Sequence, residues 1–107
     1  MGESTVVDLE DRLLARHETE SMVFEVNLDA VEVTDVTLRL HRDGEKVGSI
    51  YNDHGTEKTM AHLTTPGDDF VGVEVPKSFV SELLDLAEET GRVADGDPET
   101  YRLRMLD

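Results

Sequence analysis

Two alternating runs decide the fold: residues 36–42, VTLRLHR, and residues 45–51, EKVGSIY, on either side of Asp43-Gly44. Apolar and polar residues alternate in both runs, as they do in a β-strand that buries one face. An Asp-Gly pair between two such runs is the strongest short signal for a hairpin, because both residues accept the positive φ angles of a type I′ turn. The sequence therefore predicts an antiparallel hairpin with Arg42 opposite Glu45.

Further strands are predicted on both sides of this hairpin. Residues 58–64 and 69–75 alternate in the same way, and residues 65–68, TPGD, carry the Pro and Gly of a type II turn between them. The region 36–75 is thus predicted to be a four-stranded antiparallel meander. Residues 22–28 also alternate and predict a separate strand.

The segment after Pro76 predicts an amphipathic helix. Proline is favoured at a helix start, and Gly91 is the expected C-cap. One face of the helix is apolar and consists of Phe79, Val80, Leu83, Leu84, Leu86 and Ala87. Near the C-terminus, residues 101–105 alternate and predict a closing strand.

At the N-terminus, residues 5–18 place apolar residues at helical spacing, with a strand through 13–16 as the alternative. The expected fold class is therefore α+β: a single domain over residues 1–107, with an antiparallel meander of about four to six strands. The amphipathic helix is expected to pack on one face of the sheet, and a helix is also expected near the N-terminus.

The charge of the chain is strongly acidic, with 25 Asp and Glu against 10 Lys and Arg and a formal net charge of −15. The acids are spread along the whole chain, whereas a docking site for a basic partner would gather them. The composition resembles that of cytosolic proteins of extreme halophiles, whose surface repulsion is screened in molar salt. No basic stripe is present to neutralise phosphates, so nucleic acid is not an expected partner.

Several functional classes are disfavoured by what the sequence lacks. It contains no Cys, and it has no apolar run near the roughly 20 residues of a membrane span. No basic and apolar leader follows Met1, so we expect a cytoplasmic protein that does not act at a membrane. The sequence shows no nucleophile elbow and no glycine-rich phosphate loop.

The second face of the predicted meander is the candidate binding surface. If the hairpin pairs without interruption, Leu40 lies opposite Val47, and Gly48 lies opposite Ala61 on the other face. Glycine inside a strand often marks the close approach of another backbone or a ligand. The candidate residues are Arg39, Gly48, Ile50, Ala61, Leu63, Phe70 and Gly72. A slip of one residue would exchange the two faces.

Three coverings of this face remain open: the N-terminal segment of the same chain, a second subunit, or a small molecule near Arg39. The four histidines are not spaced as a metal site, so no metal, cofactor or catalytic residue is predicted. Arg92, Arg102 and Arg104 form a local basic cluster, for which pairing with acids of the same chain is the simplest expectation.

We therefore predict a non-catalytic interaction module that forms a homodimer through the candidate face or docks another protein there. The alternative is an enzyme or small-molecule-binding domain that uses the same face or the loop around His54. These two hypotheses differ in whether the face is flat and self-complementary or holds a concave pocket.

Overall fold

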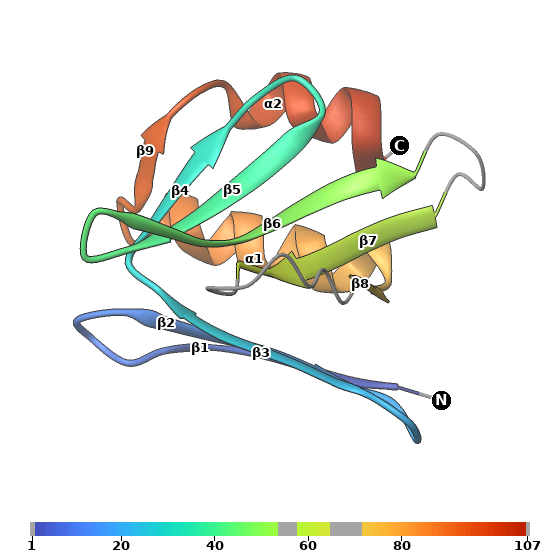
Figure 1. Ribbon diagram of the computed structural model, residues 1–107. Coiled ribbons are helices and arrows are strands. Elements are labelled where there is room, and N and C mark those ends of the chain that lie inside the picture. Colours follow the sequence, from blue (N-terminus) through green and yellow to red (C-terminus); the bar gives the residue numbers. More distant parts are fainter. Residues whose placement is uncertain (1, 54–57, 65–71, 107) are drawn as a thin grey trace.

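The computed structural model describes residues 2–53, 58–64 and 72–106 and arranges them in two β-sheets with helices on one side (Figure 1). In chain order, the elements are β1 (Glu3–Asp8), β2 (Leu13–Glu18), β3 (Val23–Leu28), β4 (Ala30–Val33), β5 (Thr37–Arg42), β6 (Glu45–Asp53), β7 (Lys58–Leu63), β8 (Gly72–Glu74), α1 (Lys77–Glu89), β9 (Val93–Asp95), α2 (Pro98–Tyr101) and η1 (Arg102–Leu106), the last a π-helical turn. The predicted class, α+β with an antiparallel sheet and an amphipathic helix, is confirmed.

The N-terminal region forms the first sheet, sheet A, with the antiparallel order β1-β2-β3. The helix expected over residues 5–18 is wrong, because the chain reverses between β1 and β2, where Glu10 has a φ of 77°. The alternative, a strand through residues 13–16, is confirmed and lies within β2. Leu13, Ala15 and His17 alternate along β2 and are all buried. Helical spacing of a few apolar residues did not distinguish one helix from two short strands.

Strand β3 confirms the strand predicted over residues 22–28 and leads through Asp29 directly into the second sheet, sheet B. Sheet B has the order β8-β7-β6-β5-β4-β9. The predicted hairpin is its centre, and Asp43 and Gly44 have φ angles of 54° and 80°, as a type I′ turn requires. Strand β4 and the edge strand β9 were not predicted, and they pair with each other in parallel. The turn predicted at residues 65–68 lies outside the described residues.

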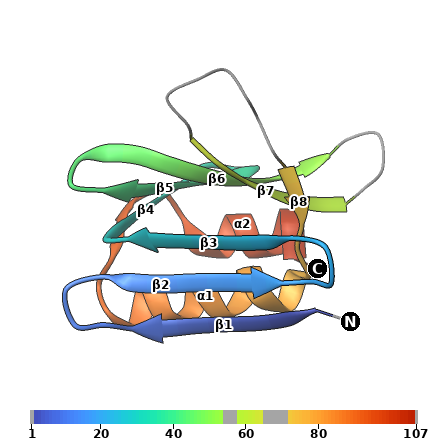
Figure 2. The same cartoon turned by 60° about the horizontal axis from the view of Figure 1, so that its bottom comes forward.

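Helix α1 is confirmed, and its C-terminal end is followed by Gly91 with a φ of 71°. The helix lies against sheet A (Figure 2) and buries its apolar face there. The Phe79 ring contacts the rings of His17 and Phe24, with centroid distances of 5.8 and 6.3 Å. The buried residues of sheet A, sheet B and the helices form one hydrophobic cluster.

The C-terminal segment is helical, so the closing strand predicted over residues 101–105 is wrong. The side chain of Asp97 accepts a hydrogen bond from the Glu99 N–H, and Pro98 occupies the first turn, which together start a helix. Tyr101 and Met105, four residues apart, are buried, whereas Leu103 is 68% exposed. The apparent alternation of these residues was therefore part of a helical stripe. No helix among the described residues is long and apolar enough to cross a membrane.

Candidate functional site

A β-bulge in the central hairpin exchanges the two faces of sheet B relative to the sequence prediction. His41 pairs with Lys46, but the next pair is Leu40 with Gly48, so Val47 is the extra residue. The predicted pairing of Leu40 with Val47 is therefore wrong. Residues 48–52 of β6, after the bulge, face the opposite side of the sheet from the one expected, because side chains alternate along a strand.

The bulge moves most of the predicted binding surface into the protein interior. Ile50 and Ala61 are completely buried, and they pair directly with one another on the core face. Gly48 is also buried and lies between Leu40 and Leu63 on the same face. Of the seven candidate residues, only Arg39 and Gly72 lie on the outer face, and Phe70 is outside the described residues.

Gly48 does mark a close backbone approach, as a glycine within a strand often does. A Cβ atom at this position would lie 2.9 Å from the carbonyl oxygen of His62 in the neighbouring strand β7. The backbone that requires glycine is therefore part of the same chain, at the bulge. The N-terminal segment, one of the three coverings left open for this face, forms sheet A, and β3 of that sheet packs against the core side of β5, β6 and β7.

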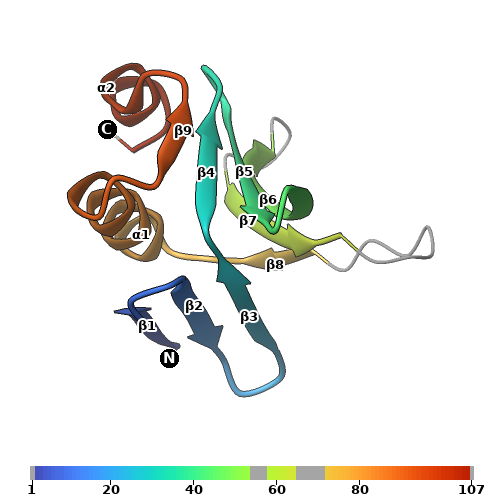
Figure 3. The ribbon, with the colours of Figure 1, turned by 90° about the vertical axis from the view of Figure 1, so that its left-hand side faces the viewer.

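The outer face of sheet B, as the structure defines it, carries two rows of directly paired residues. The first row is Arg39, Ser49, His62 and Gly72, and the second is Thr37, Tyr51, Met60 and Glu74. Both helices lie on the opposite side of the sheet (Figure 3). We call these eight residues, together with Glu32, His41, Lys46 and Lys58 around them, the outer face.

The centre of the outer face is weakly polar. Tyr51, Met60 and His62 are half-buried, and the Tyr51 and His62 rings meet edge to face with their centroids 5.4 Å apart. Burial, and secondarily the positive charge of Lys46, lowers the pKa of His62 below its usual value. The imidazole is therefore neutral at pH 7 and contributes no charge to the centre.

Charged pairs of both signs surround this centre. Arg39 donates to the Glu32 carboxylate at 3.2 Å, and His41 lies 3.7 Å from the same carboxylate. At the other end, Lys58 lies 3.8 Å from Glu74. Among the described side chains of the outer face, three basic ones, Arg39, Lys46 and Lys58, and two acidic ones, Glu32 and Glu74, thus nearly balance, in a chain whose net charge is −15. The outer face is a near-neutral area on a strongly acidic protein.

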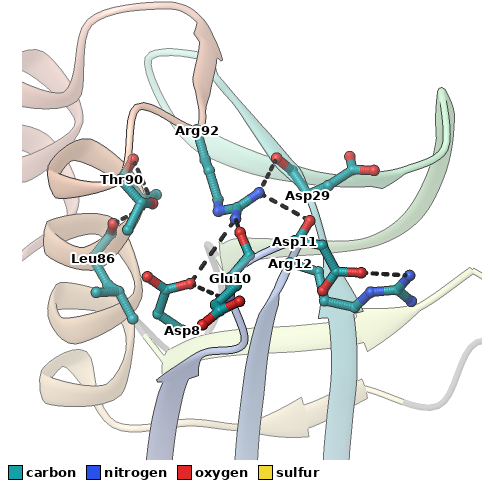
Figure 4. Close-up of polar contacts among 9 residues, drawn as sticks. Asp8, Glu10, Asp11, Arg12, Asp29, Leu86, Thr90 and Arg92 are labelled. Atoms are coloured by element: carbon teal, nitrogen blue, oxygen red, sulfur yellow. Dashed lines mark hydrogen bonds and ion pairs between the residues drawn. The ribbon is translucent and has the colours of Figure 1, made fainter.

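The predicted basic cluster near the C-terminus is divided by the structure, and two of its members pair within the chain. The Arg92 guanidinium donates to the backbone carbonyls of Glu10 at 2.8 Å, Asp11 at 3.3 Å and Asp29 at 3.4 Å (Figure 4). Its side chain is only 14% exposed. Arg92 therefore holds the β1–β2 turn and the junction between the two sheets against the end of α1.

Arg102, the first residue of η1, also pairs with the C-terminal half of α1. Its guanidinium contacts Asp85 and Glu88 of the helix, both at 2.5 Å, and Glu99 of its own segment at 3.5 Å. Hydrogen bonds and attraction to these carboxylates raise the pKa of Arg102 despite its burial. Arg104 is exposed. The guanidinium groups of Arg92 and Arg102 are thus both occupied by acceptors of the same chain.

The histidines of the described residues give no metal site, and no group of three His, Asp or Glu side chains that could hold an ion occurs among them. His17 is buried and its Nδ1 hydrogen-bonds the Ser4 hydroxyl at 2.7 Å. His54, with its loop, is outside the described residues. Comparison with protein-family models, curated proteins and solved structures found no match for this chain.

Proposed function

We propose that the protein is a non-catalytic interaction module that associates with a second copy of itself through the outer face of sheet B. The observation that carries this proposal is the near-neutral charge of the outer face within a strongly acidic chain. Two copies repel one another least where each presents balanced charge. The predicted homodimer is thereby retained, but the surface proposed for it is different.

The composition of the outer face supports an interface. The cores of protein interfaces are enriched in Tyr, Met and Arg, and their rims are polar. Tyr51 and Met60 occupy the centre, and the Arg39–Glu32 and Lys58–Glu74 pairs lie at opposite ends. A two-fold axis through the centre would bring acids and bases of both copies together, as a self-complementary interface requires.

The size of the outer face predicts weak association. Four strands about 4.8 Å apart and about 20 Å long cover about 400 Å². A stable interface buries about 800 Å² on each partner, so the expected dissociation constant is micromolar or weaker. The dimer should accordingly form at high protein concentration and in molar KCl, where the repulsion between the acidic surfaces is screened.

Sedimentation velocity over a concentration series in molar KCl tests this proposal. Tyr51→Asp should weaken dimerisation by at least about ten-fold, because it places a charge at the centre of the interface. Leu103→Asp introduces the same charge at a residue that is 68% exposed and lies outside the outer face, so it should have no effect. A wild-type protein that remains monomeric at millimolar concentration, or equal effects of the two variants, would rule the proposal out.

A further inference from the structure

A groove of about 210 Å³ runs between the two sheets and is lined by none of the outer-face residues. It is lined by Glu25, Val26 and Asn27 on one side, and by Arg42, Val47, Leu63 and Thr64 on the other. The first three residues belong to β3, and the others lie at the bulged hairpin and the end of β7. The groove is thus the space between a strand of sheet A and the adjoining corner of sheet B.

The wall formed by β3 is the edge of a strand. Three consecutive residues of β3, Glu25, Val26 and Asn27, line the groove. Their side chains nevertheless alternate between the two faces of sheet A: Val26 is buried, whereas Glu25 is exposed and Asn27 is half-buried. Consecutive residues share one wall only where the backbone itself borders the space. Among the described residues, β3 pairs with β2 alone, so this second edge of β3 is open to another strand.

The opposite wall supplies apolar contact and one positive charge. Val47, the extra residue of the bulge, and Leu63 are both half-buried, and the Val47 carbonyl accepts a hydrogen bond from the Thr64 N–H at 2.9 Å. Arg42 is half-buried, and within the part of the chain that the structure describes it has no ion-pair partner. By contrast, Arg16, Arg39 and Arg102 each contact a carboxylate.

We propose that this groove binds an extended segment of a partner protein, which adds to the free edge of β3 as a fourth strand of sheet A. An apolar side chain of that segment rests on Val47 and Leu63, and a carboxylate side chain pairs with Arg42. Strand addition of this kind derives its affinity from main-chain hydrogen bonds and its specificity from the side-chain sites beside them. An unpaired arginine favours a carboxylate, with which it forms two parallel hydrogen bonds.

Fluorescence anisotropy with a labelled probe peptide, acetyl-Val-Asp-Val-Asp-Val-amide, tests the proposal in molar KCl. At this ionic strength, screening leaves mainly contact interactions, because the Debye length is about 3 Å. Saturable binding at micromolar to millimolar concentration is expected, and Arg42→Gln should weaken it by about ten-fold. Arg104→Gln removes the same charge from an exposed position outside the groove and should leave binding unchanged.

Two further probes separate strand addition from simple charge attraction. The same peptide with its alternate amides N-methylated cannot form the ladder and should not bind. The peptide with Lys in place of Asp should bind at least about ten-fold more weakly. In amide hydrogen exchange, binding should protect one alternate set of β3 amides. No saturable binding of the parent peptide, or equal binding of the N-methylated peptide, would overturn the proposal.

Discussion

Arg92→Met is expected to lower the free energy of unfolding by about 2–3 kcal/mol. Methionine retains the packing of the aliphatic stem and removes only the guanidinium. A hydrogen bond from a charged donor contributes about 1.5–3 kcal/mol, and the bond to the Glu10 carbonyl, at 2.8 Å, has full strength. The bonds to Asp11 and Asp29, at 3.3 and 3.4 Å, are long and contribute less.

Urea and thermal denaturation in molar KCl measure this loss, which corresponds to a fall in Tm of about 10–15 °C for a domain of this size. Arg104→Met, at an exposed position, is the matched control and should change stability by less than about 0.5 kcal/mol. The acceptors are neutral carbonyls, and surface charges are already screened at about 1 M KCl. The loss of stability caused by Arg92→Met should therefore be nearly the same at about 1 M and about 3 M KCl.

Two results would refute this account of Arg92. Equal stability of the Arg92→Met and Arg104→Met variants would show that the three carbonyl contacts contribute nothing. A loss that shrinks steeply as KCl rises would instead assign the effect to the Asp8 carboxylate, which lies 4.0 Å from the guanidinium. Arg92→Lys discriminates further, because a single ammonium group cannot reach all three carbonyls and should recover less than half of the loss.

Four other predictions concern stability. Gly48→Ala should destabilise the protein by about 1–3 kcal/mol in urea denaturation, because the new Cβ atom would crowd the His62 carbonyl; an unchanged midpoint would contradict the bulge. Tyr101 is completely buried and its hydroxyl lacks a hydrogen-bond partner among the described residues, so Tyr101→Phe should be neutral or stabilising. Burial raises the pKa of Tyr101 above that of the unfolded chain. Above about pH 10, where only the unfolded chain ionises this tyrosine, the free energy of unfolding of the wild type should therefore fall by up to about 1.4 kcal/mol per pH unit, and that of Tyr101→Phe should lack this fall. Parallel pH profiles of the two proteins would contradict this. Dilution from about 1 to 0.1 M KCl should lower the urea midpoint, since the Debye length grows from about 3 to 10 Å; an unchanged midpoint would contradict salt adaptation.

The parts of the fold that could be predicted from the sequence are those with a strong local signal. The Asp43-Gly44 turn and helix α1 each combine a periodic pattern with a residue whose backbone conformation is nearly obligatory. The N-terminal helix failed because a few apolar residues at mixed spacing fit two short strands equally well. At the C-terminus, Asp97-Pro98 carried the signature of a helix start, and this signal should have outweighed the alternation of Tyr101, Leu103 and Met105.

The candidate surface was predicted incorrectly because of a single residue. An uninterrupted pairing of β5 with β6 is locally as plausible as a bulged one, and only packing of the whole sheet decides between them. The bulge at Val47 allows Ile50 and Ala61 to join the core, where both are completely buried. Gly48 was the one available clue, since a glycine inside a strand pattern indicates a bulge as well as a binding site.

The basic residues carry more information about function than the acidic ones, because a carboxylate is expected everywhere on this chain. Arg92 and Arg102, 14% and 22% exposed, hold segments of the fold together and are occupied by acceptors of the same chain. Arg39 is 48% exposed, beside the near-neutral centre of the outer face. Arg42 is half-buried at the open edge of β3. Arg39 and Arg42 border the two surfaces proposed as binding sites, so these are the positions where partners should be sought.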